Sequence, residues 1–146
     1  MIVAEQRHVL VAPPRTVAFI VPGKPCAKQS MRFTLAGRRY QPRDVVEYRS
    51  RVAIFARQAW PHDPLEGPVE VEVVALFLKP VSWSKKRRAA EYLHAQKPDF
   101  DNLSKAAADG IKGILIRDDA QISDARISKR WSDHREELQV TVRAAG

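Results

Sequence analysis

Apolar residues follow two different periods along the chain, and their order predicts the fold. Residues 17–22, VAFIVP, form a short run rich in β-branched side chains, which predicts a strand. Residues 43–60 repeat apolar side chains every three or four positions, which predicts an amphipathic helix that Pro61 stops. Its expected apolar stripe consists of Val45, Tyr48, Val52, Phe55 and Ala59.

The second half of the chain predicts further strands around a second helix. Residues 69–79 alternate valine with glutamate and then become apolar on both faces, which is typical of a central strand. Residues 121–132 alternate imperfectly, which predicts a strand with a bulge. Residues 136–143 predict a last strand whose buried face carries Leu138, Val140 and Val142.

This order of elements predicts an α/β fold, a single mixed α/β domain with a small mixed sheet and two main helices, over residues 17–146. Residues 1–16 are expected to be an N-terminal tail or a short edge strand, because Pro13-Pro14 interrupt the apolar residues before them. At 146 residues the chain has room for one real core.

Charge narrows the class of partner. The chain has 25 Lys and Arg against 17 Asp and Glu, a net charge of +8. Such an excess favours nucleic acid over a membrane, although a plain basic surface is the alternative. The single cysteine, Cys26, excludes an intrachain disulfide and a cysteine-based zinc cluster. We see no secretory signal and no apolar run of transmembrane length, so we expect a cytoplasmic protein without a membrane partner.

The candidate chemistry lies in residues 97–122, KPDFDNLSKAAADGIKGILIRDDAQI. Pro98 favours an extended entry, in which Asp99 and Asp101 would point the same way. A helix with Leu103, Ala107, Ile111 and Ile114 on its apolar face should follow, capped by Asp101 or Asn102. The chain then reaches Asp118 and Asp119, of which one is expected to join the first pair.

Three carboxylates that converge need a cation between them. Oxygen ligands without a nearby His or Cys suit Mg²⁺, or alternatively Mn²⁺, rather than zinc. Lys105, one turn after Asp101, could stabilise negative charge at the same site. The alternative is that these acids are ordinary loop, cap and turn residues.

Two basic segments are candidates for contact with the backbone phosphates of a nucleic acid. The first combines basic residues with Phe33 and Tyr40, and its alternative is a solvated loop; its basic residues are Lys24, Lys28, Arg32, Arg38 and Arg39. The second is the cluster just before Asp99, which reads either as a phosphate clamp or as a solvated helix start; it consists of Lys85, Lys86, Arg87 and Arg88.

Residues 97–122 resemble the signature of the RusA-type Holliday junction resolvases and their phage and prophage relatives. The shared elements are D-x-D-N-L-x-K, a helix containing Asp109-Gly110, and D-D-A-Q-I. The segment VPGKPCAKQSMRF also resembles the opening of the phage-type members. The resemblance implies Asp99, Asp101 and Asp119 as Mg²⁺ ligands, with Asp118 as the alternative third acid, a catalytic Lys105, and Asn102 as a residue that positions the loop or touches DNA.

The resemblance also implies a homodimer that resolves four-way DNA junctions by paired symmetric nicks in recombination and repair. A two-fold protein suits a two-fold substrate. Three alternatives stay open: a junction-binding module without catalysis, a related nuclease acting on flaps, forks or RNA, and a metal-binding regulator that would leave the charge of +8 unexplained.

Overall fold

A four-stranded mixed sheet forms the centre of the molecule, in the strand order β1-β6-β4-β5. The computed structural model describes residues 15–26, 32–33, 35–37, 39–40 and 43–146. Its strands are β1 (Thr16–Pro22), β2 (Arg32–Phe33), β3 (Arg39–Tyr40), β4 (Val69–Leu78), β5 (Ile122–Ser132) and β6 (Glu137–Ala144). Its helices are α2 (Arg43–Ala59), α3 (Lys85–Ala90), α4 (Phe100–Ile111) and the 3-10 turn η1 (Asp119–Gln121). The predicted mixed α/β class is confirmed.

The strand β4 is central, as predicted. It pairs antiparallel with β6 and parallel with β5, and its side chains alternate between buried and half-buried positions up to its last residue, Leu78, which is exposed. The predicted bulge in β5 is confirmed by a shift of register, because Val69 pairs with Ile122 while Glu70 pairs with Asp124. On β6, the side chains of Leu138, Val140 and Val142 are buried together, as predicted.

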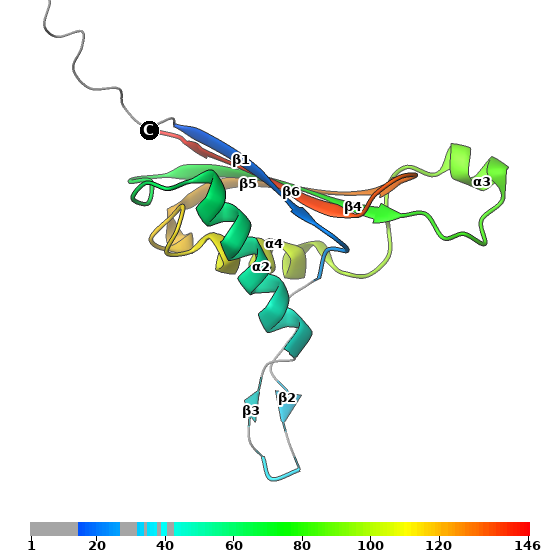
Figure 1. Ribbon diagram of the computed structural model, residues 1–146, viewed down its shortest axis with the longest axis horizontal. Coiled ribbons are helices and arrows are strands. Elements are labelled where there is room, and N and C mark those ends of the chain that lie inside the picture. The colour runs from blue at the N-terminus through cyan, green and yellow to red at the C-terminus, as the bar shows by residue number, and fades with distance from the viewer. Residues whose placement is uncertain (1–14, 27–31, 34, 38, 41–42) are drawn as a thin grey trace, which may run out of the picture.

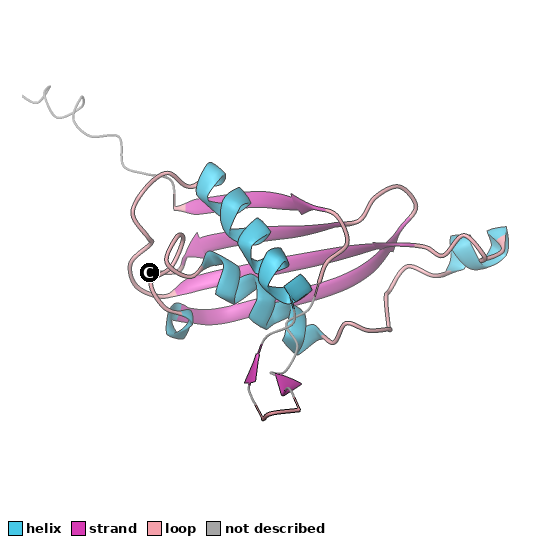
Figure 2. Cartoon of the chain, turned by 60° about the horizontal axis from the view of Figure 1, so that its bottom comes forward, coloured by secondary structure: helices cyan, strands magenta, loops and turns pink. Residues whose placement is uncertain are grey.

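The helices α2 and α4 cover one face of the sheet, and the other face is left uncovered by the described elements (Figures 1 and 2). The buried stripe of α2 runs through Tyr48, Val52 and Ala56 to Trp60 just beyond the helix. The stripe is therefore rotated from the predicted one, since Phe55 and Ala59 are only half-buried. The side chain of Val45 lies outside the part that the structure describes.

Parallel strands need a crossover, and α4 lies in the crossover between β4 and β5. The predicted acid pairs therefore lie at the two ends of α4, one at its N-terminus and one in the turn that follows it. On the way to α4 the chain forms an arm that carries α3 beyond the end of the sheet, while the hairpin β2–β3 projects on the helix side (Figure 1). No helix in the described part of the chain has the length and apolar character to cross a membrane.

Candidate functional site

The first acid pair lies at the N-terminus of α4. Asp99 is the N-cap residue in extended conformation (φ −71°, ψ 152°), and Asp101 lies in the first helical turn. The prediction that Asp101 or Asn102 caps the helix is wrong, because the helix already begins at Phe100 and the Leu103 amide donates to the Asp99 carbonyl (3.1 Å). Both residues are exposed at the N-terminus of the helix.

The two carboxylates open onto one hollow of about 580 Å³. They share it as predicted, although Asp101 is helical rather than extended. The hollow is lined by Ala95, Gln96, Lys97, Asp99, Phe100, Asp101 and Lys129. Two acids therefore face a space that also receives two ammonium groups and one aromatic ring.

The two lysines that line the hollow have different partners. Lys97 forms an ion pair with Asp99 (3.1 Å) on the exposed rim. Lys129 comes from β5, and its Nζ donates to the Gln96 carbonyl (2.5 Å), which ties the entry loop to the sheet. Partial burial lowers the pKa of Lys129, and the negative charge of Asp99 opposes this shift. Sequence reasoning missed Lys129 because only the parallel pairing of β5 brings it to the acids.

The second acid pair lies in the turn after α4. Asp118 accepts a hydrogen bond from the Ala120 amide (3.0 Å) and caps η1 together with Gln121. This backbone hydrogen bond, the neighbouring Asp119 and the charge of Lys112 lower the pKa of Asp118. Asp119 instead pairs with Lys112 across 3.7 Å. The two acids thus have different partners: the Asp118 carboxylate caps η1, and the Asp119 carboxylate pairs with a lysine.

Gln121 fixes this turn in place. Its Oε1 accepts from the amides of Arg117 (2.7 Å) and Asp118 (3.1 Å). Its Nε2 donates to the carbonyls of Leu65 (2.9 Å) and Gly67 (2.8 Å). The glutamine in D-D-A-Q-I is therefore a structural residue that connects the acid-bearing turn to the loop before β4.

Within one chain the two acid pairs do not meet. Asp99 caps the N-terminus of α4, whereas Asp119 pairs with Lys112 at its C-terminus, and 12 helical residues separate them. At 1.5 Å per residue this is about 18 Å. The expectation that one acid of the second pair joins the first within the chain is not met, and in the described residues no three His, Cys, Asp or Glu are grouped to hold a metal.

The chemistry of the first pair still suits a hard cation. Mg²⁺ is commonly held by one or two carboxylates, with water and substrate phosphate as the remaining ligands. Asp99 and Asp101, both exposed beside an open hollow, match that set. The third predicted ligand, Asp119 or Asp118, does not fit in the same chain. Lys105 is exposed and lies about one turn after Asp101, and Asn102, the residue next to Asp101, is half-buried.

The basic cluster before the acids forms the exposed helix α3, which Ser84 caps by accepting from the Arg87 amide (3.1 Å). Of the two predicted roles, the structure bears out the helix start, and the phosphate clamp stays a prediction. Arg87 stacks over Trp83 at 3.9 Å from the ring centroid and pairs with Glu91 (2.8 Å). Arg88 donates to the Pro80 carbonyl (2.7 Å). Arg87 and Arg88 therefore hold the arm together.

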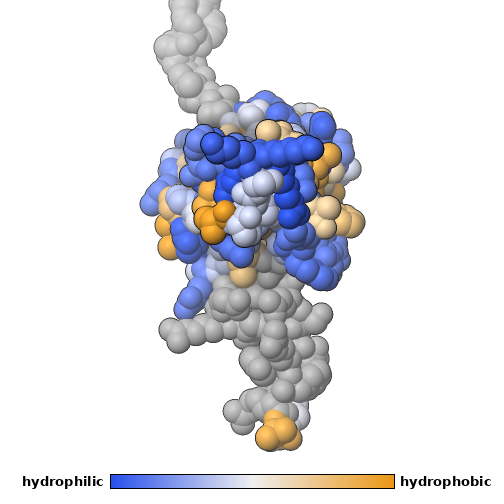
Figure 3. Space-filling view, turned by 90° about the vertical axis from the view of Figure 1, so that its right-hand side faces the viewer, coloured by the Kyte–Doolittle hydropathy of each residue, from blue (hydrophilic) through white to orange (hydrophobic). Residues whose placement is uncertain are grey.

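The lysines of this cluster point outward instead. Lys85 and Lys86 are exposed, and the end of the molecule that carries α3 has a largely hydrophilic surface (Figure 3). The two lysines are thus better placed than Arg87 and Arg88 to meet a polyanion.

The other basic segment is described only in part. Lys24 is exposed after β1, and Arg32 and Arg39 belong to the paired strands β2 and β3. Lys28 and Arg38 lie outside the described residues. β2 and β3 form a short hairpin, with Gly37 between them in a left-handed conformation (φ 82°).

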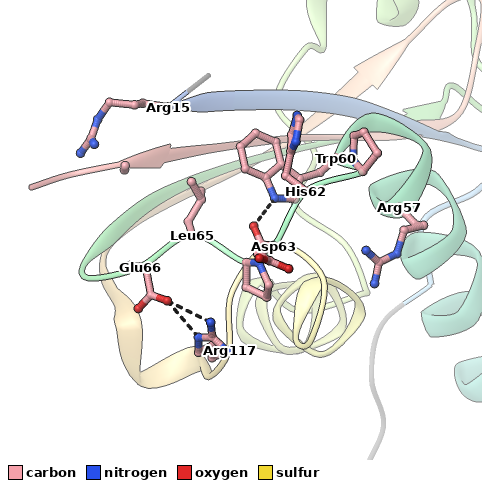
Figure 4. Close-up of a pocket in the computed structure, with 11 residues that line it drawn as sticks. Arg15, Arg57, Trp60, His62, Asp63, Leu65, Glu66 and Arg117 are labelled. Carbon is pink, nitrogen blue, oxygen red and sulfur yellow. Dashed lines mark hydrogen bonds and ion pairs between the residues drawn. The ribbon is translucent and has the colours of Figure 1, made fainter. Parts of the chain in front are cut away.

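A larger hollow of about 840 Å³ lies elsewhere, between the end of α2 and the loop before β4 (Figure 4). Arg15, Arg57 and Arg117 surround it, and Arg117 pairs with Glu66 (2.9 Å). None of the predicted ligands lines this hollow. By size alone this larger hollow would be the candidate site. The smaller hollow is the better candidate because it contains the carboxylates that can bind a cation.

Comparison with known proteins adds to this geometry. The family described as "Endodeoxyribonuclease RusA" matches residues 22–143, a range that includes both acid pairs, Lys129 and the arm. The chain is also similar to "Uncharacterized protein YqaN" of Bacillus subtilis (strain 168). The two are 28% identical over 126 residues, which cover 80% of this chain and 89% of the relative.

Proposed function

The chain belongs to the RusA family of endodeoxyribonucleases, and from this premise we propose that it resolves Holliday junctions by metal-dependent, paired symmetric nicks in recombination and repair. The observation that carries the proposal is the hollow in which Asp99 and Asp101 stand together at the N-terminus of α4. A basic arm and a basic hairpin project from the same molecule and supply charge for a branched polyanion.

Asp99 and Asp101 would hold Mg²⁺, or alternatively Mn²⁺. When bound, the ion lowers the pKa of a water molecule and neutralises charge on the phosphate. The protein holds the two carboxylates ready, because the cap position and the first turn of a helix fix their backbone. Lys105 is assigned to the developing negative charge on the phosphate, and Asn102 to the position of the loop or to DNA contact.

The third carboxylate favours a homodimer. One chain keeps Asp119 about a helix length away from Asp101, so a second copy is needed if Asp119 is to reach the same ion. A two-fold dimer would also present two equivalent sites to the two strands of a junction. Asp119 is the preferred third ligand over Asp118, because the Asp118 carboxylate is committed to capping η1.

The proposed DNA contacts extend from the hollow in two directions. Lys85 and Lys86 are exposed on α3, with Arg87 and Arg88 as the residues that hold this arm. On the hairpin side the proposed contacts are Lys24, Lys28, Arg32, Arg38 and Arg39. Such contacts to phosphate give affinity without sequence preference, and the shape of a branch supplies the selectivity.

The test is cleavage of an end-labelled mobile four-way junction in Mg²⁺, with wild type beside Asp101→Asn. Asp124→Asn is the matched control, since it removes an exposed carboxylate from β5 without touching the hollow. Paired nicks that ligase can seal, made by the wild type and the control but lost in Asp101→Asn with junction binding retained, support the proposal.

Tight binding without cutting in Mg²⁺ or Mn²⁺ would leave a junction-binding module. Faster cutting of a fork or a flap than of the junction, measured in parallel with linear duplex, would assign a related nuclease with another branched substrate.

A further inference from the structure

Phe100 stands exposed between the two acids of the hollow. It continues the apolar stripe of α4 by helical spacing, three residues before Leu103 and seven before Ala107, both of which are buried. Its side chain is nevertheless 67% exposed, because the first turn of α4 extends beyond the hydrophobic core. The ring lines the same hollow as Asp99 and Asp101.

The surroundings of the ring indicate what covers it. Within the hollow it is flanked by the carboxylates of Asp99 and Asp101 and by the ammonium groups of Lys97 and Lys129. In the proposed dimer the second chain brings the Asp119 carboxylate towards this hollow, and a carboxylate gives the ring no apolar cover. Charged residues are also depleted from the cores of protein interfaces, so a wider apolar contact between the two chains does not suit this hollow. A nucleotide suits both parts: its phosphate meets the charged groups, and the flat face of its base meets the ring.

We propose that Phe100 stacks on an unpaired base beside the phosphodiester that the enzyme cuts. The inference rests on the proposed nuclease function and adds the source of its selectivity. In linear duplex both faces of each base are already stacked, so the ring finds no partner without unstacking the helix. At a branch point a base can leave the stack, and the ring then stabilises the complex.

The size of the effect follows from base stacking on aromatic side chains. Loss of one such contact weakens binding by about ten- to hundredfold. Phe100→Leu keeps apolar bulk and removes the aromatic face, so it should lose this part of junction affinity while linear duplex affinity stays within about twofold. Phe100→Trp keeps a stacking face and should restore junction binding.

The experiment uses a junction with 2-aminopurine at the branch point and Ca²⁺ in place of Mg²⁺, so that binding is read without cutting. The full-length wild type should quench the probe, as should Phe100→Trp, whereas Phe100→Leu should not quench it. Ile54→Ala, which shortens another exposed apolar side chain on α2, should behave as wild type. Unfolding curves of all variants confirm that each is folded.

Equal quenching and equal junction preference in wild type and Phe100→Leu would overturn the proposal. So would a fall in molar mass of Phe100→Leu by sedimentation, because the ring would then be part of a subunit contact. Failure of the nuclease function itself is distinguishable, since the wild type would quench the probe in Ca²⁺ and leave the same junction uncut in Mg²⁺.

Discussion

Gly110 of α4 meets Val52 of α2 so closely that a Cβ on the glycine would stand 2.4 Å from the Val52 Cγ1. Both residues are buried, and Val52 has no exposed surface. The contact lies near the C-terminus of α4, whose N-terminus carries Asp99 and Asp101. The absence of a side chain at residue 110 thus sets how deeply the helix that bears the acids packs.

Gly110→Ala should destabilise the protein although alanine favours helices. The alanine gains up to about 1 kcal/mol in helix propensity, but overpacking of a tight core costs about 1–3 kcal/mol. We expect a lower free energy of unfolding in urea, with Ser104→Ala on the same helix as the control.

A double-mutant cycle tests the cause of this loss. Val52→Ala removes the Val52 Cγ1 that the new Cβ would meet at 2.4 Å but keeps the Val52 Cβ at 2.6 Å, so Gly110→Ala should cost less, though still something, in the Val52→Ala background than in wild type. If the two changes in the free energy of unfolding are strictly additive, the loss of stability in Gly110→Ala has a cause elsewhere in α4.

Periodicity predicted the parts of the fold that are held by local pattern and burial. Alternation in β4 and β6, and the repeat in α2, reproduce the structure because each element buries one face. The rotated stripe of α2 shows the limit of the method. Ala56 and Trp60 replace Phe55 and Ala59 in the core because the contacts with α4 and the sheet, which no single segment encodes, select the buried side.

The site, like the fold, was predictable only where local sequence carries the signal. The acids and their motif are local signals, so Asp99, Asp101 and the D-D-A-Q-I turn stand out in the chain. Lys129 gives no such signal, since β5 brings it to the hollow from a distant segment. The separation of the acid pairs also depends on α4 being a straight spacer between them, which the spacing of the residues alone leaves open.

His94 makes stability depend on pH. It is buried between Phe77 and Trp131, with ring centroids 4.1 and 4.3 Å away, and its Nδ1 faces the Gln96 amide (3.5 Å). Burial, followed by the charges of Lys129 and Lys24, lowers the pKa of His94 from 6.5.

Below pH 6.5 the unfolded state therefore binds more protons at this residue, and the free energy of unfolding should fall as the pH drops towards the folded-state pKa. His94→Phe keeps the ring stack and removes the titration. Urea unfolding between pH 7 and 5 should show a shallower decline for the variant. Parallel pH profiles for the two proteins would contradict this assignment.

The arm makes a prediction that separates its lysines from its arginines. Lys85→Ala with Lys86→Ala should lower the slope of log Kd against log salt for junction binding by up to about 1.8, from two lost phosphate contacts, and leave the fold unchanged. Arg87→Ala with Arg88→Ala should additionally increase amide exchange in residues 80–91, because the contacts to Trp83 and the Pro80 carbonyl are lost. If the lysine variant binds like wild type at every salt concentration, α3 does not contact DNA.

Asp118 and Asp119 should respond differently to the same substitution. Asparagine can still cap η1, so Asp118→Asn should keep the hydrogen bond from the Ala120 amide and retain cleavage within about tenfold. Asp119→Asn removes the carboxylate that pairs only loosely with Lys112, and with it the proposed third ligand, so cleavage should fall at least about a hundredfold while junction binding persists. Single-turnover cleavage across a Mg²⁺ titration measures both variants, and it separates weaker ion binding from slower chemistry.

A large loss of cleavage in Asp118→Asn, beside nearly normal cleavage by Asp119→Asn, would reverse the roles of the two acids. The cap of η1 would then have to open when the ion binds.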